Sequence, residues 1–227
     1  MKFRTLAGTD LNISVIGFGC WAIGKTYWGD DVDDANSSEE VRAAIDHGIN
    51  WFDTAPLYGE GHSDKVLVNA IGSDIERVTI ATKVGVRLGG EGEHARSELT
   101  AQWIRRDVDN SLQRLGIDEI DLLQVHWPCE SGTPLHESLD VLEQLRDAGK
   151  IRFYGLCNYE GPEVREAAKR PGMVSLQTPY SLLRREFEAD LRSACIDIKP
   201  VSVLAYEPLC RGLLTGKFRD QPRFPDT

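Results

Sequence analysis

The chain has 227 residues, of which 41% are apolar and 8% aromatic, and it carries a formal net charge of −10 at neutral pH. This length and apolar content predict a single barrel domain over residues 1–227, because α/β barrels are long for one domain. The negative charge argues against nucleic acid and against an anionic membrane surface as partners, since both would be repelled.

Membrane, secreted and metal-binding classes are also disfavoured. No window approaches the roughly 20 apolar residues of a membrane span, and the N-terminus lacks the apolar core of a secretory signal, so a cytoplasmic protein is expected. The five cysteines are odd in number and show no C-x-x-C spacing. Neither a disulfide framework nor a metal site is therefore expected.

Short β-rich runs alternate with amphipathic segments along the chain, which predicts consecutive βαβ units on a parallel sheet. A small hairpin over residues 3–14 comes first, and it could plug the bottom of a barrel. The sequence then predicts seven strands, at residues 15–18, 51–53, 78–83, 121–126, 153–156, 174–177 and 201–206.

Capping residues mark the intervening helices. Ser37 and Glu40 have the spacing of a capping box, and Gly48 has the position of a left-handed C-terminal cap. A second helix is predicted to begin at Ser97 and to end at Gly116. A third helix is predicted over residues 133–149, with threonine as N-cap and proline at the first helical position.

Seven strand–helix units are one short of a (β/α)₈ TIM barrel, and the chain stops in a polar, proline-bearing segment at residues 219–227. The expected fold is therefore a (β/α)₈ barrel that is incomplete at its C-terminal end and that exposes strand edges. A fragment, a truncated gene and part of something longer all remain open.

Two phosphate-binding patterns occur near the first strand. Residues 19–26 match the G-x-x-x-x-G-K-T of a P-loop, and residues 17–22 match the G-x-G-x-x-A of a dinucleotide fingerprint. Neither pattern is followed at once by a helix, as both motifs require. A glycine loop at the end of the first strand is the simpler interpretation.

Four polar residues follow predicted strands and form a stronger pattern: Asp53, Tyr58, Lys83 and His126. A lysine beside a tyrosine is expected to lower a phenol pKa that starts near 10, and Asp53 can orient that lysine. Tyr58 could then pass a proton to a carbonyl oxygen, while His126 donates a hydrogen bond to the same oxygen. This chemistry is typical of carbonyl reduction, in which a cofactor supplies the hydride.

Each of the four also has an ordinary interpretation. Asp53 could cap a turn, Lys83 could be a solvated strand end, His126 could be a hydrogen-bonded, half-buried residue, and Tyr58 could be a core residue. A Schiff-base aldolase using Lys83 is a further alternative. It is disfavoured because Asp53 would keep the lysine charged.

Several motifs in order resemble those of the aldo-keto reductase family. They are the D-T-A-x-x-Y-G of residues 53–59, the lysine strand at 81–83, the histidine strand at 124–128, and the loop at 206–217. The glycine loop at 19–24 and the Trp28–Gly29 pair look most like the bacterial, stress-protein-type branch of that family.

The resemblance implies reduction of aldehydes or ketones to alcohols with NADPH. It makes Tyr58 the general acid, with Asp53 and Lys83 tuning it and His126 orienting the substrate. It assigns cofactor binding to Cys20, Trp21, Asp53, Cys157, Asn158, Gln177, Tyr206, Glu207, Leu209, Arg211, Gly212 and Lys217. Of these, Asn158 and Gln177 would hold the nicotinamide carboxamide, Tyr206 would stack on its ring, and the loop from Leu209 to Lys217 would clasp the pyrophosphate.

Two departures from the family pattern matter. Cys157 stands where the family usually has serine, which weakens one hydrogen bond and predicts looser cofactor binding. The family's eighth strand and the loop that grips the adenosine 2′-phosphate would lie beyond Thr227. The choice between NADPH and NADH is therefore open.

Other outcomes remain open. The chain could be a truncated, inactive or cofactor-sensing binding module, as the related potassium-channel β subunits are partners rather than free enzymes. A monomer or weak homo-oligomer is expected. Four aromatic residues, Trp21, Trp28, Tyr58 and Trp127, suggest a pocket for aromatic or medium-chain aldehydes.

Overall fold

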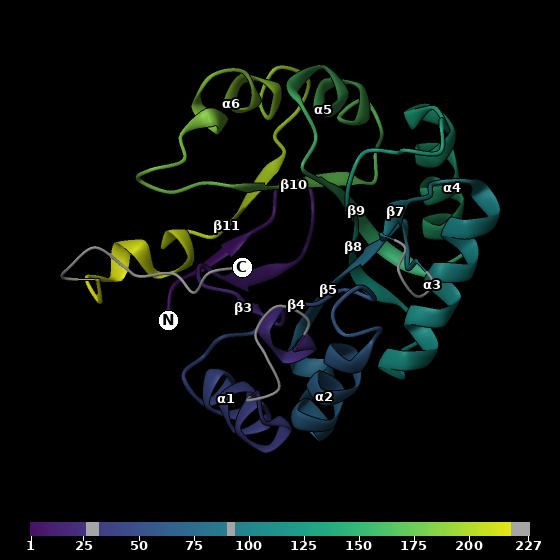
Figure 1. The fold of residues 1–227 in the computed structure, drawn as a ribbon. Coiled ribbons are helices and arrows are strands. Elements are labelled where there is room, and N and C mark those ends of the chain that lie inside the picture. The colour runs from purple at the N-terminus through teal and green to yellow at the C-terminus, as the bar shows by residue number, and fades with distance from the viewer. Residues whose placement is uncertain (26–31, 90–93, 219–227) are drawn as a thin grey trace.

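A parallel sheet of seven strands forms the centre of the fold in the computed structural model, which describes residues 1–25, 32–89 and 94–218. The strand order is β11-β10-β9-β8-β5-β4-β3. The strands are β3 (Phe18–Gly19), β4 (Trp51–Asp53), β5 (Thr79–Val84), β8 (Ile120–Val125), β9 (Ile151–Cys157), β10 (Met173–Pro179) and β11 (Ser202–Tyr206). The sheet is curved and the helices lie on its outer side (Figure 1), so the predicted α/β barrel-type arrangement is confirmed.

The order of the strands follows the order of the sequence, as expected for repeated right-handed βαβ units. In the described part of the chain β3 and β11 are the edge strands, and β5 and β8 lie between neighbours on both sides. The carboxyl ends of parallel strands lie at the same edge of a sheet. Residues that follow β4, β5, β8, β9, β10 and β11 are therefore brought to one end of the molecule.

Six α-helices are described: α1 (Asp34–Asp46), α2 (His62–Ile71), α3 (Ala101–Leu115), α4 (Leu135–Asp147), α5 (Gly161–Ala167) and α6 (Leu191–Ala194). Short 3₁₀ turns are η1 (Ala22–Gly24), η2 (Gly72–Arg77), η3 (Glu186–Glu188) and η4 (Cys210–Thr215). The apolar sides of α3, α4 and α5 pack on the outer side of β8, β9 and β10 in one cluster. A second cluster joins α1 and α2 to β4 and β5.

The first helix begins earlier than the sequence predicted. Asp33 is the N-cap of α1, and its carboxylate accepts hydrogen bonds from the backbone N–H groups of Ala35 and Asn36, both at 3.3 Å. The capping box predicted for Ser37 and Glu40 is therefore wrong. An aspartate four residues upstream satisfies the free N–H groups first.

The two other predicted helix starts are also displaced. Ser97 belongs to β7 (Arg96–Ser97), which pairs with β6 (Val86–Arg87) in a small antiparallel hairpin, and Thr100 caps α3 instead. Pro134 has extended backbone angles and is itself the N-cap of α4 rather than its first helical residue. The predicted helix ends are confirmed, since the glycines at 48, 116 and 149 have φ of 84°, 65° and 70°.

The N-terminal hairpin fills the inside of the curved sheet. Its strands are β1 (Phe3–Thr5) and β2 (Asn12–Ser14), paired antiparallel. Leu6, Leu11 and Ile13 are at most 4% exposed and pack against apolar residues of β5, β8, β10 and β11. In the turn of the hairpin, the backbone N–H of Ala7 donates a hydrogen bond to the Ser202 hydroxyl at 2.7 Å. The prediction of a plug is confirmed.

The first predicted sheet strand is shorter than expected. Val15 and Ile16 are 51% and 58% exposed, and β3 starts only at Phe18. The Val15 N–H donates to the carbonyl oxygen of Lys2 at 2.9 Å, so this residue continues the pairing of the hairpin instead of the large sheet. The apolar run at residues 15–18 is therefore divided between the N-terminal hairpin and the large sheet.

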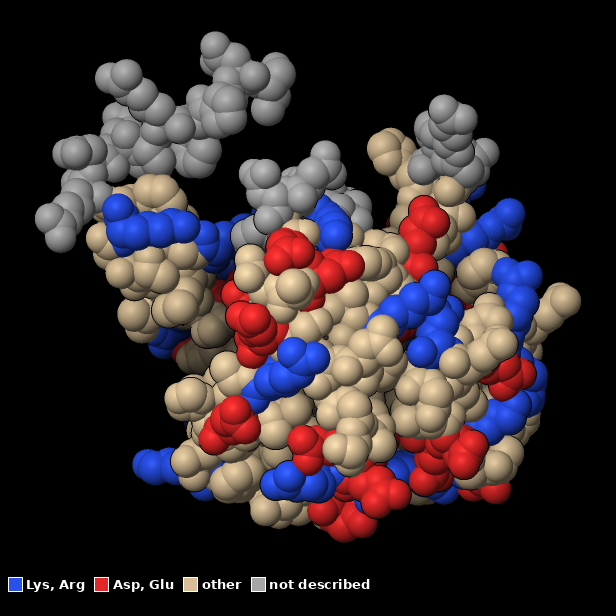
Figure 2. Space-filling model, turned by 90° about the horizontal axis from the view of Figure 1, so that it is seen from below, with Lys and Arg blue, Asp and Glu red and all other residues tan. Residues whose placement is uncertain are grey.

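On the face seen in Figure 2, Lys and Arg side chains are interspersed with Asp and Glu side chains. Exposed pairs such as Arg165–Asp190 at 2.6 Å and Lys169–Glu166 at 2.6 Å occur on the surface. Exposed pairs contribute little to stability, and the cores described above carry the fold. None of the helices in the described ranges is long and apolar enough to cross a membrane.

Candidate active site

A buried ion pair lies where β4 and β5 end. Lys83 is 1% exposed, and its ammonium nitrogen lies 2.8 Å from each carboxylate oxygen of Asp53. The same ammonium donates to the carbonyl oxygen of Thr54 at 3.1 Å. An ammonium has three protons, so these acceptors use all of its donors. Burial is the largest single effect and lowers the pKa of Lys83, but the charge and hydrogen bonds of Asp53, with smaller effects from Tyr58 and Cys157, together outweigh it, and the net shift is upward.

The loop after β4 is held by a second buried carboxylate. Asp64 on α2 is 0% exposed; it accepts from the Thr54 hydroxyl at 2.7 Å and from Arg114 Nε at 3.0 Å. Because a buried charge is tolerated only when it is paired and hydrogen-bonded, this group fixes the backbone next to Asp53. The loop that carries Tyr58 therefore starts from a rigid point.

Tyr58 is held by a close backbone contact with η1. A Cβ added at Gly24 would lie 2.6 Å from the Tyr58 carbonyl carbon, and one added at Gly59 would lie 2.5 Å from the Gly24 carbonyl oxygen. Only glycine at both positions permits this approach. The Tyr58 ring lies 6.0 Å from the His126 ring, edge to face, and its centroid lies 5.5 Å from the Lys83 ammonium.

The expectation that Lys83 lowers the pKa of Tyr58 is wrong for the net shift. Burial raises the pKa of Tyr58 to about 12, and the opposing effect of the Lys83 charge is smaller. The charge of Asp53 also raises this pKa, because it partly cancels the lysine. The phenol is therefore protonated at neutral pH.

His126 follows β8 and is 7% exposed. Its backbone N–H donates to the Val84 carbonyl oxygen at 3.1 Å, and its ring stacks on Trp127 with 4.3 Å between the ring centroids. Its Nδ1 is buried and has no hydrogen-bond partner. Burial, with a smaller effect of the Lys83 charge, lowers the pKa of His126 well below its ordinary value, so the ring is neutral at pH 7.

Three of the side chains assigned to the nicotinamide lie beside this group. Tyr206, the last residue of β11, donates from its hydroxyl to Asn158 Oδ1 at 2.7 Å, and Asn158 Nδ2 donates to the His126 carbonyl oxygen at 3.1 Å. Gln177 is 6% exposed and accepts from the Cys157 thiol at 3.2 Å. The ends of β8, β9, β10 and β11 are thus linked by side chains of the predicted site.

The loop after β11 holds the other predicted residues and is more exposed. Glu207 accepts from Arg211 Nε at 2.7 Å, and both residues have positive φ, 52° and 53°. Leu209 is 53% exposed. A Cβ at Gly212, whose φ is 95°, would lie 2.8 Å from the Cε atom of Lys217. These side chains contact one another rather than the buried ion pair.

Trp21 and Cys20 differ in position although they are neighbours. The Arg211 guanidinium lies 5.5 Å from the Trp21 ring centroid, so the loops that follow the two edge strands meet. The Cys20 side chain is 0% exposed and packs in the core beneath α1 and α2. Its backbone N–H donates to the Asp53 carbonyl oxygen at 2.8 Å, and its thiol is close enough to the ion pair for the charges of Asp53 and Lys83 to affect its pKa, which burial raises. Trp28 and Thr26 lie outside the described residues.

Sequence reasoning did not single out Gln124. It lies on β8 directly beside Lys83 in the strand pairing, is 0% exposed, and donates from Nε2 to Asp53 Oδ1 at 3.1 Å. A signal is present in the sequence, because the amide of Gln124 stands between the apolar residues Leu123 and Val125. Gln124 gives the carboxylate a second donor besides Lys83.

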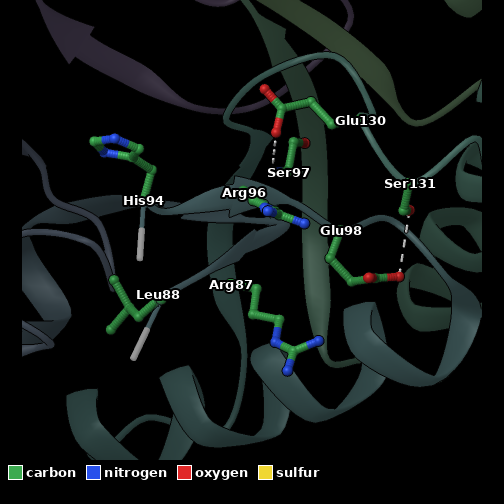
Figure 3. Close-up of a pocket in the computed structure, with 9 residues that line it drawn as sticks. Arg87, Leu88, His94, Arg96, Ser97, Glu98, Glu130 and Ser131 are labelled. Carbon is green, nitrogen blue, oxygen red and sulfur yellow. Dashed lines mark hydrogen bonds between the residues drawn. The ribbon is translucent and has the colours of Figure 1, made fainter. Parts of the chain in front are cut away.

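A cavity of about 330 Å³ lies beside the β6–β7 hairpin, outside the site just described. Figure 3 shows charged and polar side chains around it, from Arg87, His94, Arg96, Glu98, Glu130 and Ser131. Glu130 accepts from the Ser97 backbone N–H at 3.2 Å, and Ser131 donates to Glu98 at 3.3 Å. None of the four strand-end residues lines it, so we do not place the chemistry there.

Comparison with known proteins agrees with the fold and the motifs. The family model described as "Aldo/keto reductase family" matches residues 15–227. The aldo-keto reductase YhdN of Bacillus subtilis is 39% identical over 226 residues, which are 99% of this chain and 67% of that protein. An NADH-specific methylglyoxal reductase of Escherichia coli is 36% identical over 95% of this chain and 70% of its own length.

Solved structures show the same relationship. The structure of a glycerol dehydrogenase from Gluconobacter oxydans has a TM-score of 0.89 and 36% identity, and the match covers 98% of this chain and 68% of that one. An aldo-keto reductase from Bacillus halodurans has a TM-score of 0.85 and 32% identity, over 98% of this chain and 70% of that one. The chain thus belongs to the aldo/keto reductase family, a family of oxidoreductases that use nicotinamide cofactors. It spans about two thirds of the length of these relatives.

Proposed function

We propose that this chain reduces aldehydes or ketones to alcohols with NADPH, and that Tyr58 is the proton donor. The observation that carries the proposal is the Lys83–Asp53 pair, whose lysine is buried, beside Tyr58 and His126. Burying a charged pair is costly, and perturbed titratable groups gathered at strand ends are typical of catalytic sites.

The protonation states suit this reaction. A phenol with a pKa of about 12 holds its proton at neutral pH and can donate it as an alkoxide develops on the substrate. The adjacent Lys83 ammonium would stabilise the phenolate that remains after transfer. NADPH, when bound, would supply the hydride.

His126 is suited to hold the carbonyl oxygen. A neutral imidazole has one N–H, and a buried N–H without an acceptor is rarer than a buried acceptor without a donor. Since Nδ1 has no partner, we assign the proton to Nε2. That N–H can donate to the same oxygen that Tyr58 protonates.

Residues in or directly after β9, β10 and β11 fit a nicotinamide. Asn158 and Gln177 offer amide groups, which can pair with a carboxamide, and Tyr206 offers an aromatic face. Lys83 does not fit an aldolase, since its three protons are engaged and its pKa is raised, which disfavours the neutral amine that an imine requires.

The test is NADPH oxidation by the purified chain after addition of an aromatic aldehyde, with NADH in parallel. Tyr58→Phe should lower kcat by at least about a hundredfold, the usual contribution of a positioned acid, and leave NADPH affinity nearly unchanged. Tyr180→Phe is the matched control, because that hydroxyl donates to Glu188 on the surface. Full kcat in Tyr58→Phe would contradict the proposal, and NADPH binding without turnover would favour the sensing module.

The proposal also predicts a pH profile. Because Tyr58 must be protonated and its pKa is raised to about 12, kcat for reduction should stay level through pH 9 instead of falling near pH 8. Turnover measured from pH 6 to 10 checks this. A basic limb with a midpoint near 8 would show that a different group donates the proton.

A further inference from the structure

A line of buried side chains joins Asp53 to Gln177 across the inside of the sheet. Gln124 donates to Asp53 at 3.1 Å through Nε2, and its Oε1 lies 3.7 Å from the Cys157 sulfur. The same sulfur lies 3.2 Å from Oε1 of Gln177. Gln124, Cys157 and Gln177 are 0%, 1% and 6% exposed, so these groups depend on one another for hydrogen bonds.

Chemistry fixes the direction of each bond in the line. An ionised carboxylate only accepts, so Gln124 must turn its NH₂ group toward Asp53 and its carbonyl oxygen toward Cys157. Burial raises the pKa of Cys157 and keeps the thiol protonated. The charge of Lys83 lowers this pKa and the charge of Asp53 raises it, and both effects are smaller than that of burial. The thiol has one hydrogen for two carbonyl oxygens, and the shorter distance assigns it to Gln177.

We propose that Gln124 and Cys157 are positioning residues that couple the proton-donating group to the nicotinamide subsite. Gln124 holds the Asp53 carboxylate that fixes Lys83. Cys157 holds the Gln177 oxygen, which leaves the Gln177 NH₂ group as the donor for a ligand carbonyl. This inference rests on the proposed function and adds to it a residue, Gln124, that contacts neither substrate nor cofactor.

Both residues are expected to affect cofactor binding, and Gln124 is expected to affect the chemical step as well. Gln124→Leu removes a donor to a charged group and the oxygen beside the Cys157 sulfur, so we expect kcat to fall about tenfold and the NADPH dissociation constant to rise. Cys157→Ala leaves Asp53 and Lys83 intact, so we expect the NADPH dissociation constant to rise severalfold with kcat almost retained. Cys157→Ser restores a donor and should return the dissociation constant to the native value or below it.

A double-mutant cycle tests the coupling. The NADPH dissociation constant is measured by tryptophan fluorescence for Gln124→Leu, Cys157→Ala and the double variant. If the residues act in one line, the double variant should bind more tightly than the product of the two single effects predicts. Gln113→Leu, on the exposed side of α3, is the matched control and should bind as the native chain does. A double variant that shows the simple product would overturn the coupling.

A second measurement needs no cofactor. In ¹⁵N–¹H spectra of the ligand-free chain, Cys157→Ala should shift the side-chain NH₂ resonances of both Gln124 and Gln177. Unchanged resonances would show that the line does not exist. If they shift and the native chain binds no nicotinamide, the proposed function fails and the hydrogen-bonded line stands. If the native chain reduces aldehydes and both variants match it, the proposed function stands and this inference fails.

Discussion

The ends of the central strands and the loop after β11 carry residues of the same candidate site in two different environments. Lys83 and Gln124, on β5 and β8, are 1% and 0% exposed and have a paired strand on either side. Leu209 and Arg211 follow an edge strand; Leu209 is 53% exposed and the Arg211 side chain 67%. We call the buried residues on β5 and β8 the rigid half of the site, which is suited to chemistry. We call the exposed loop after β11 the adaptable half, which is suited to binding a ligand.

The largest expected effect comes from breaking the rigid half. Asp53→Asn leaves the Lys83 ammonium buried without its counter-charge, and we expect the free energy of unfolding to fall by about 3–5 kcal/mol. Asp190→Asn removes the exposed partner of Arg165 and should cost at most about 1 kcal/mol. Urea denaturation at pH 7 measures the free energy of unfolding of both variants. Equal losses of stability would contradict the distinction between the rigid half and the exposed surface.

Apolar side chains should show the same contrast. Leu123→Ala on β8 removes a 0% exposed side chain and should cost about 2–5 kcal/mol. Val203→Ala on the edge strand β11 truncates a side chain that is 37% exposed, and should cost less than about 1 kcal/mol. The two midpoints of denaturation provide the measurement. A larger loss at Val203 would mean that β11 is covered in solution.

A buried carboxyl beside the rigid half gives a pH-dependent prediction. Burial raises the pKa of Asp107 on α3 from 3.8 to about 6, although the Gly85 N–H donates to it at 3.0 Å. A carboxyl whose pKa is higher in the folded state favours folding while protonated, and this contribution is lost as pH rises from about 4 to 6. Asp107→Asn should therefore gain up to about 3 kcal/mol at pH 7 and little at pH 4.

Denaturation of native and Asp107→Asn chains across pH 4–7 checks this prediction. The variant keeps an oxygen that can accept from Gly85, so the turn after β5 is retained. A constant difference between the two chains over this range would show that Asp107 does not titrate there.

The smallest effect on stability is expected in the adaptable half. Arg211→Gln removes an exposed ion pair with Glu207 and the contact with Trp21, worth at most about 1 kcal/mol. The same change should weaken NADPH binding severalfold if this loop holds the pyrophosphate. Arg192→Gln, an exposed control, should do neither. Unchanged affinity in Arg211→Gln would exclude that arginine from the cofactor site.

The sequence predicts best where a single local rule applies. Asp53, Lys83 and His126 are identifiable because each is a polar residue at the end of an apolar run, and parallel strands end together. The hairpin and the glycines that end the helices follow from local backbone preferences in the same way. The helix starts are predicted wrongly, because several residues that can cap a helix lie close together and the sequence does not show that Asp33 and Thr100 are the ones used.

The sequence does not show how deeply each side chain of the candidate site is buried. The pKa of Tyr58 rises because η1 and β8, distant in sequence, exclude water from it, and the lysine effect that local chemistry predicts is smaller. Cys20 lies in a core cluster with residues of α1 and α2, which only the packing of these helices against the sheet establishes. Gln124 needed the register of β8 against β5 before its partner could be named.

The plugging hairpin also bears on the order in which the chain folds. The hydrogen bond from Ala7 to Ser202 joins residues 195 positions apart, and Leu6 and Leu11 share an apolar cluster with Leu204 of β11. Contacts of such sequence separation carry a large loop-closure entropy and form slowly. The hairpin is therefore expected to dock only after β11 has been synthesised and paired.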